Sequence, residues 1–244
     1  MPADASRGVF VTGTDTGVGK TLVAAALARH LRGRNLDVGV MKPVETGVTD
    51  PGRPGPDAAL LQWAACCADD PALIAPYRLR APLAPALAAE EESVRVDLAH
   101  IVEAVRSMSD RHDFTIVEGA GGLMVPLVGG LLVADLVLQL GLPLLVVCRP
   151  GLGTINHTLL TVHAARTMGI PLAGFIINGT PQQPDAAEAL APHTLASLAS
   201  ADLLGVLPWV EGDERKKIDI LAEAIAGLPT LPWLMQALGL REDR

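Results

Sequence analysis

Aromatic residues are scarce in this chain of 244 residues, in which three Phe, three Trp and one Tyr make up 3% of the sequence. So few rings leave few platforms on which nucleic-acid bases could stack. Basic residues are also outnumbered, with 19 Lys and Arg against 27 Asp and Glu and a net charge of −8. Proteins that bind a nucleic-acid backbone show the opposite balance, so we expect no nucleic-acid partner.

Cysteine is equally rare, and three Cys cannot form a disulfide framework. The six His lack the short paired spacings typical of zinc sites. The first residues, MPADASRG, have no apolar core of the kind found in signal peptides. Pro and Gly break the most apolar stretch, residues 123–148, into pieces too short to span a bilayer. We therefore expect a cytoplasmic protein that has no contact with a membrane.

Half of the chain is hydrophobic, which excludes an intrinsically disordered protein. Short apolar runs alternate with longer helical patterns. Strands are predicted over residues 9–12, 38–41, 114–117, 144–148, 172–177 and 204–207, and a loop over 43–56. Helices are predicted over residues 20–32, 58–68 (capped by Asp57), 96–109, 154–168, 185–199, 218–226 and 233–238.

Strands that are apolar on both faces and separated by helices indicate a mostly parallel sheet covered on both sides. The sequence contains no internal repeat and no linker long enough to divide it. We predict a single α/β domain over residues 1–244, with a core of about residues 8–214 and a helical extension over 215–244.

The segment GTDTGVGKT, residues 13–21, lies between a predicted strand and a predicted helix, as a P-loop requires. Its glycines let backbone N–H groups surround phosphate oxygens. Lys20 would reach the β- and γ-phosphates, and the Thr21 hydroxyl would bind Mg²⁺. Thr14 replaces the first glycine of the usual pattern, with Gly13 one position earlier. The segment predicts a site for a nucleoside triphosphate.

Four further polar side chains, in three clusters of the sequence, are expected near the P-loop. Lys42 and Thr46 belong to KPVETG after the second strand, and Glu118 belongs to VEGAGG after the third. Asp57 adds a carboxylate at a helix start. Ligand sites of open α/β sheets form along the carboxyl ends of the strands, so we expect these side chains to meet the P-loop.

Together GTDTGVGKT, KPVETG, VEGAGG and LGTINH make the chain similar to the dethiobiotin synthetase family, from about residue 9 to residue 214. The resemblance implies a P-loop NTPase-like fold and a homodimer. It also implies an ATP- and Mg²⁺-dependent ligase that joins 7,8-diaminopelargonic acid and CO₂ into the ureido ring of dethiobiotin, a step of biotin synthesis, and releases ADP and phosphate.

The resemblance also assigns residues. It implies that Lys20 and Lys42 are catalytic, that Thr21, Asp57 and Glu118 bind the metal, and that Thr46 contacts the substrate. A further group would receive the substrate carboxylate from the neighbouring subunit, namely Gly153, Thr154, Ile155 and Asn156. ATP would contact Thr16, Gly17, Val18, Gly19, Lys20, Thr21, Leu22, Asp57, Glu118, Gly119, Ala120, Gly121, Asn178, Gly179, Pro208, Trp209 and Val210.

Two other classes of protein share such a P-loop. Switch ATPases of the ParA/MinD kind carry a second lysine early in the loop, where this chain has Asp15. Cobyrinic and cobyric acid amide synthetases need an additional glutaminase domain, for which 244 residues leave no room. A ligase of the same fold that acts on another diamine or acid remains an alternative.

Overall fold

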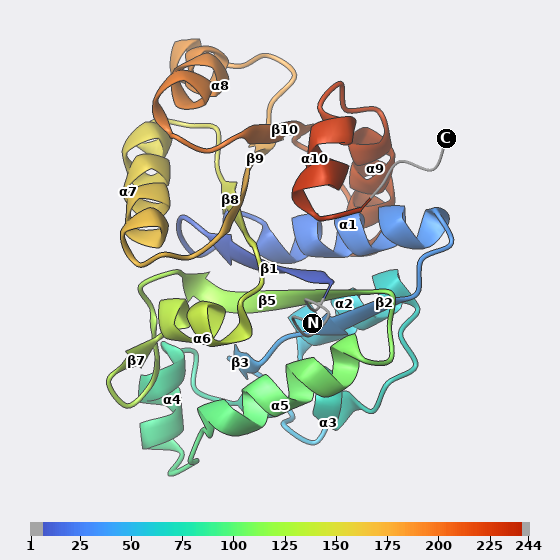
Figure 1. Cartoon of the computed structure of the whole chain (residues 1–244), viewed down its shortest axis with the longest axis vertical. Coiled ribbons are helices and arrows are strands. Elements are labelled where there is room, and N and C mark those ends of the chain that lie inside the picture. Colours follow the sequence, from blue (N-terminus) through green and yellow to red (C-terminus); the bar gives the residue numbers. More distant parts are fainter. Residues whose placement is uncertain (1–6, 241–244) are drawn as a thin grey trace, which may run out of the picture.

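One parallel sheet of six strands organises the computed structural model, which describes residues 7–240 (Figure 1). Most residues of these strands are buried, because helices cover both faces of the sheet. The predicted α/β fold class is therefore confirmed. The strands are β1 Gly8–Gly13, β2 Val38–Met41, β5 Phe114–Gly122, β8 Leu144–Cys148, β9 Leu172–Thr180 and β10 Leu203–Pro208.

The strand order is β10-β9-β8-β1-β5-β2, and every pair of neighbours is parallel. From β1 the chain first builds the side that contains β2 and β5, and then crosses to the side that contains β8, β9 and β10. The connections reverse direction at β1, and ligands bind at such a switch point, outside the carboxyl ends of the strands. The P-loop follows β1 and thus lies there.

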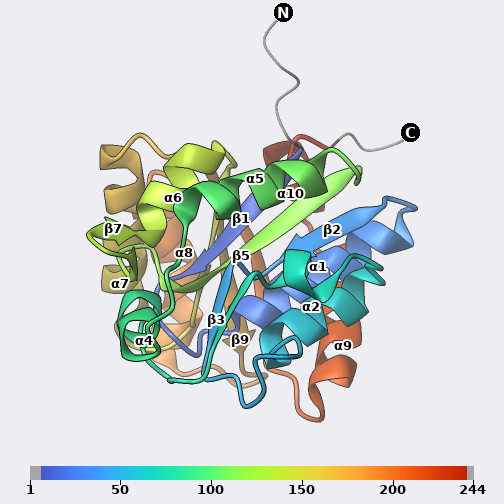
Figure 2. The ribbon, with the colours of Figure 1, turned by 90° about the horizontal axis from the view of Figure 1, so that it is seen from below.

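The helices α1 Lys20–Gly33, α2 Pro56–Ala65 and α9 Glu214–Ala226 cover one face, while α5 Leu98–Ser109 and α6 Val133–Leu140 cover the other (Figure 2). Along the β8–β10 side, α7 Thr154–Thr167 packs on β8 and β9 beside α8 Ala186–Leu198, and α10 Leu231–Ala237 packs on β9 and β10. No single helix within residues 7–240 is long and apolar enough to cross a membrane; α9 and α10 together would be, but they meet at 99°.

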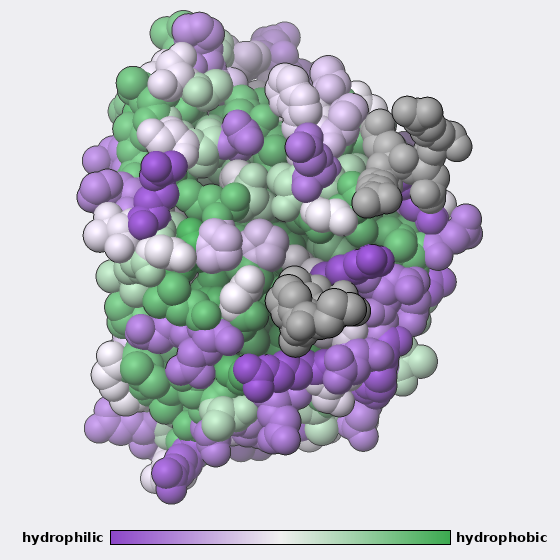
Figure 3. All heavy atoms as spheres, viewed as in Figure 1, coloured by the Kyte–Doolittle hydropathy of each residue, from purple (hydrophilic) through white to green (hydrophobic). Residues whose placement is uncertain are grey.

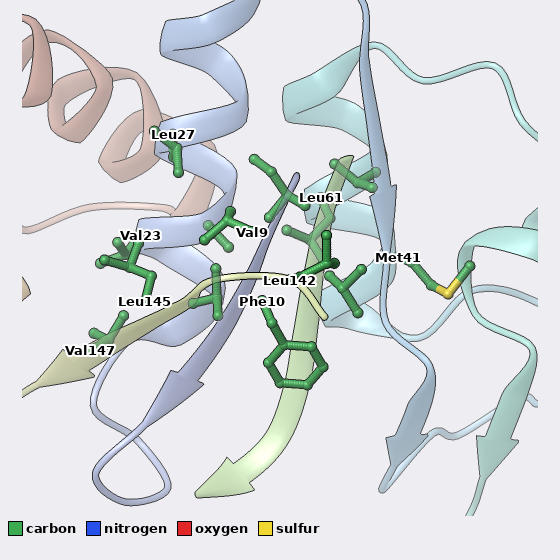
Figure 4. Packing of buried hydrophobic residues seen from close by; sticks show 14 of the residues in the cluster. Val9, Phe10, Val23, Leu27, Met41, Leu61, Leu142, Leu145 and Val147 are labelled. Carbon is green, nitrogen blue, oxygen red and sulfur yellow. The ribbon is translucent and has the colours of Figure 1, made fainter. Parts of the chain in front are cut away.

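The core is aliphatic around a few Phe rings. Val9 and Phe10 are adjacent in β1 and point to opposite faces of the sheet, as neighbours in a strand do (Figure 4). Val23 of α1 packs in the same buried cluster as Val9. A Cβ on Gly119 would lie 2.8 Å from the Phe10 ring, so the absence of a side chain there makes room for Phe10.

The structure differs from the prediction in the segments that connect these elements. The predicted loop over residues 43–56 contains the short strand β3 Val44–Thr46, which pairs with β4 Tyr77–Leu79. The short helices α3 Pro71–Ile74 and α4 Pro85–Glu91 and the β6–β7 hairpin (Pro126–Val128 and Leu131–Leu132) were not predicted. The last two helices contribute Ile218, Ile225 and Leu234 to the buried cluster that the sheet builds.

Candidate active site

The P-loop wraps the start of α1. Gly17 and Gly19 have φ values of 71° and 86°, a left-handed backbone that glycine adopts without steric cost. Asn178 at the end of β9 donates from Nδ2 to the carbonyl oxygen of Val18 at 3.1 Å, and any Cβ on Gly19 would collide with this amide. The first N–H groups of α1 are thereby presented toward the cleft beside Lys20, an arrangement that suits phosphate.

A lysine between two carboxylates forms the centre of the site. Lys42 Nζ lies 2.6 Å from Glu118 Oε1 and 2.8 Å from Asp57 Oδ2. The hydroxyl of Thr21, in the first turn of α1, donates to the same Glu118 oxygen at 2.8 Å. Lys42 is 4% exposed and Glu118 is fully buried. The strands β2 and β5, which pair in register at Met41 and Val117, bring Lys42 and Glu118 side by side.

Burial and the paired charges act against each other in this cluster. Burial by itself would lower the pKa of Lys42, but the carboxylates of Glu118 and Asp57 outweigh it and raise that pKa above its usual value. Burial raises the pKa of Glu118, and Lys42 opposes the rise. Burial lowers the pKa of Lys20, while Glu118 acts in the other direction. Lys42 therefore stays a cation in the site.

The sequence predicted Asp57 as the cap of its helix, and this prediction is wrong. The helix α2 begins at Pro56, and Gly55 stands at its N-cap. The carboxylate of Glu45 in β3 takes the capping role: it accepts hydrogen bonds from the N–H groups of Asp57 at 2.7 Å and Ala58 at 3.3 Å. Because Glu45 satisfies these donors, the Asp57 side chain is free to reach Lys42. No role was predicted for Glu45 from the sequence, although it lies in KPVETG.

The donor set fits a divalent metal ion with oxygen ligands. Glu118 Oε2 is buried and lacks a hydrogen-bond partner among the described residues. Buried polar atoms are rarely left unpaired. The other oxygen of the same carboxylate, Oε1, accepts from the Thr21 hydroxyl and from Lys42, which also pairs with Asp57. Such hard oxygen donors are those that Mg²⁺ takes from proteins.

A cleft of about 360 Å³ opens over these groups. It brings together Lys20, Thr21, Lys42, Asp57 and Glu118. It also contains other residues predicted to contact ATP, namely Thr16, Gly17, Gly19, Leu22, Ala120 and Gly121. Gly119 does not line it, although its carbonyl oxygen accepts from Lys42 Nζ at 3.5 Å. The lining is Thr16, Gly17, Gly19, Lys20, Thr21, Leu22, Lys42, Val44, Glu45, Thr46, Asp57, Leu60, Glu118, Ala120, Gly121 and Glu214.

A second pocket, of about 280 Å³, shares Gly17, Gly19 and Leu22 with this cleft. It unites five of the residues predicted to contact ATP, which are Asn178, Gly179, Pro208, Trp209 and Val210. Sequence reasoning missed Arg149, Pro150, Lys217 and Leu221 in its wall. The first two directly follow the predicted strand 144–148, at the same sheet edge, and that position was a usable signal.

The start of α7 lies elsewhere. Gly153 forms the N-cap of α7 with φ 93°, and Thr154 is buried. None of Gly153, Thr154, Ile155 and Asn156 lines the cleft or the second pocket, and Asn156 lines a separate hollow beside Leu160 and His163. A single chain therefore does not bring these four residues to Lys42.

The fold and the P-loop define a P-loop ATPase domain. Residues 7–216 match the family model described as an AAA domain. A ParA family ATPase from Chlorobium tepidum TLS superposes with a TM-score of 0.57 at 17% identity, covering 97% of this chain and 100% of that one. The cell division ATPase MinD of Pyrococcus furiosus gives 0.53 at 21% identity, over 91% and 98%. At these identities the likeness concerns the fold alone.

Sequence relatives narrow the class to one family. The ATP-dependent dethiobiotin synthetase BioD of Anaeromyxobacter sp. (strain K) is 48% identical over 83% of this chain and 90% of its own length. The protein of the same name from Bacillus subtilis (strain 168) is 42% identical over 83% and 87%. The chain belongs to the ATP-dependent dethiobiotin synthetase family and is an ATP-dependent ligase. The resemblance drawn from the four motifs is confirmed.

Proposed function

We propose that the cleft closes the ureido ring of dethiobiotin, from 7,8-diaminopelargonic acid and CO₂, with ATP cleaved to ADP and phosphate. The observation that carries this proposal is the cluster of Lys42, Glu118 and Asp57, which lies in one cleft with the P-loop. The reaction joins two anions, a carbamate and a triphosphate, and a buried lysine that stays charged meets that requirement.

The arrangement of the two pockets supports one direction for ATP along the sheet edge. The base occupies the pocket of Trp209 and Asn178, and the phosphates run past Gly17 and Gly19 onto the start of α1. Lys20 binds the phosphates. The γ-phosphate then points to the part of the cleft where Lys42 and Thr46 lie.

Thr21, Asp57 and Glu118 would hold Mg²⁺, and the unpaired oxygen of Glu118 supports this assignment. When bound, Mg²⁺ neutralises charge on the triphosphate and orients its oxygens.

Lys42 serves the chemical step itself. An amine of the diamine takes up CO₂ to form a carbamate, whose oxygen attacks the γ-phosphorus while the bond to ADP breaks. Lys42 holds the carbamate and the attacked phosphoryl group together and stabilises the charge that they share in the transition state. The second amine then attacks the carbamate carbon, the ring closes, and phosphate leaves with the C–O bond electrons.

A homodimer completes the site in this proposal. The substrate carboxylate lies at the far end of an apolar chain from the amines, and the N–H groups at the start of α7 suit an anion. Within one chain that helix start is absent from the cleft wall. Exposed apolar side chains lie just before this helix and along it: Leu152 is 86% and Leu160 59% exposed, and hydrophobic residues are frequent on the left of the face in Figure 3. An apolar surface of this kind suits a second copy of the chain.

The free cysteines favour a reducing, cytoplasmic setting.

Release of ADP is the decisive assay. With diaminopelargonic acid and bicarbonate both present, we expect steady ADP release and one dethiobiotin formed per ADP. Omission of either should reduce ADP release to background. Release of ADP that is independent of the diamine would instead favour a switch ATPase of the ParA/MinD kind, and turnover with a different diamine or acid would favour the other ligase.

Subunit mixing tests the shared site. Lys42→Ala damages one half of each site, and Asn156→Asp places a charge that repels the substrate carboxylate in the other half. A mixed dimer would then carry one intact site and one doubly damaged site. Random mixing makes about half of the dimers mixed, so two weak variants should together recover roughly a quarter of the wild-type activity. If the subunits exchange and no activity returns, the start of α7 serves its own chain only.

A further inference from the structure

We propose that Cys67, Asp69 and His112 form a second metal site, for Zn²⁺, at the end of the sheet opposite the ATP cleft. His112 lies just before β5, and Cys67 and Asp69 follow the end of α2. The amino ends of the strands are therefore the place where these residues meet, whereas the cleft lies at the carboxyl ends. The site is separate from the ligase machinery, and the proposal does not depend on the substrate of that machinery.

The ligand atoms are already close together. One atom from each of Cys67, Asp69 and His112 lies within 4.8 Å of the other two. His112 Nε2 is 2.9 Å from Asp69 Oδ2, and these two side chains are 9% and 10% exposed. Cys67 is 7% exposed. Three ligands whose donor atoms converge in a largely buried position can hold an ion without a large rearrangement.

Two of the three ligands, His112 and Asp69, are also held by side chains outside the group. His112 Nδ1 lies 2.9 Å from Asp37 Oδ2, which fixes the ring with Nε2 directed at Asp69. Arg111 binds Oδ1 of Asp69 at 3.0 Å through one guanidinium nitrogen and reaches Oδ2 at 3.4 Å through another, which orients the carboxylate. Carboxylates that orient a metal-binding histidine, and donors that orient a metal-binding carboxylate, are typical of protein metal sites.

The turn that carries two of the ligands is also fixed. Gln62 Nε2 donates to the carbonyl oxygens of Cys67 at 3.3 Å and Asp69 at 3.4 Å. Cys66, with φ 47°, ends α2 in a left-handed conformation and turns its own side chain outward, where it is exposed, while Cys67 is buried. The two adjacent cysteines therefore have different surroundings.

The donor types select the metal. A thiolate, an imidazole and one carboxylate suit Zn²⁺ or Co²⁺, whereas Mg²⁺ prefers oxygen ligands alone. The thiolate and the Asp69 carboxylate would supply two negative charges against the two positive charges of the ion. The negative charge of Asp37 and the positive charge of Arg111 balance each other beside the site. The bound ion would tie the turn after α2 to the beginnings of β2 and β5, so its expected effect is on stability.

Cobalt reports a thiolate ligand directly. The full chain, treated with a chelator and then saturated with Mg²⁺, is titrated with Co²⁺. We expect one Co²⁺ per chain with a thiolate-to-cobalt charge-transfer absorption that Zn²⁺ abolishes. Cys67→Ser should lose the band, and the matched control Cys66→Ser should keep it. Asp69→Asn and His112→Gln should bind Co²⁺ more weakly.

Thermal unfolding gives a second readout. Zn²⁺ at about 100 times its Kd should shift the ratio of folded to unfolded protein by about a hundredfold in wild type and Cys66→Ser. It should produce no shift in Cys67→Ser. The wild-type titration decides even if a variant fails to fold: without a stoichiometric charge-transfer band the proposal is wrong, and the cluster is an ion-pair network around His112. A band that is lost in Cys66→Ser would also overturn it.

Discussion

Lys42→Met removes the cation that lies between Glu118 and Asp57 and leaves the fully buried carboxylate of Glu118 without its ion pair. Breaking a buried pair by removing one partner costs about 3–5 kcal/mol of the free energy of unfolding. For a chain of this size that loss corresponds to a melting temperature lower by roughly 6–20 °C at pH 7. Turnover should be lost as well.

The loss of stability should depend on pH. Burial raises the pKa of Glu118, and in the variant Lys42 no longer opposes the rise. A carboxyl group whose folded-state pKa is raised destabilises the folded state above that pKa and ceases to do so below its unfolded pKa. The deficit relative to wild type should therefore be largest at neutral pH and shrink as the pH falls toward the ordinary range of a carboxyl group.

The double variant Lys42→Met/Glu118→Gln separates stability from catalysis. It removes both charges, so it should recover most of the lost melting temperature while remaining inactive. Thermal unfolding is followed by circular dichroism at several pH values in the presence of a chelator. Lys216→Met, at an exposed position, is the matched control and should change stability by less than about 0.5 kcal/mol. A deficit in Lys42→Met that is equal at every pH, or that persists in the double variant, would refute the reasoning.

Three further variants or treatments address neighbouring features. Glu118→Gln should raise the Mg²⁺ concentration for half-maximal ADP release severalfold, and an unchanged dependence would remove Glu118 from the metal ligands. Glu45→Ala should cost about 0.5–2 kcal/mol in urea unfolding because it uncaps α2, whereas Glu45→Gln keeps an acceptor and should lose less; equal losses would contradict the capping role. Iodoacetamide at pH 8 should label Cys66 first, because burial raises the pKa of Cys67 and raises that of Cys148 to about 11; early labelling of Cys148, seen by peptide mass spectrometry, would argue against its burial.

The sequence was most informative where burial is complete. The strands at residues 38–41 and 144–148 have the predicted bounds, because residues buried on both faces of a sheet must all be apolar. The position of Lys42 and Glu118 near the P-loop was also predictable. When strands of a sheet are parallel, the residues that follow them lie at the same edge of the sheet.

The short connecting elements had no such signal. A strand of three residues such as β3 and a helix of four such as α3 are too brief to show a period. The cap of α2 was misassigned to Asp57 because the capping carboxylate comes from Glu45 in another element, whereas sequence patterns for caps consider only neighbours. The approach of Cys67 to His112 likewise depends on how the turn after α2 meets the beginning of β5.

The two pockets of the sheet edge are built by strands on opposite sides of β1. Residues of the Trp209 pocket come from β9, β10 and α9, on one side of β1, while Lys42 and Glu118 come from β2 and β5 on the other. Among residues 7–240 the two pockets share the P-loop glycines Gly17 and Gly19 and Leu22, and Glu214 of α9 also reaches the cleft of Lys42. If the Trp209 pocket binds the base as proposed, nucleotide preference and ring-closing chemistry can diverge independently. Grafting the β9–β10 segment of a relative with another base preference should change which triphosphate is used and leave the ring-closing step at Lys42 and Glu118 unchanged.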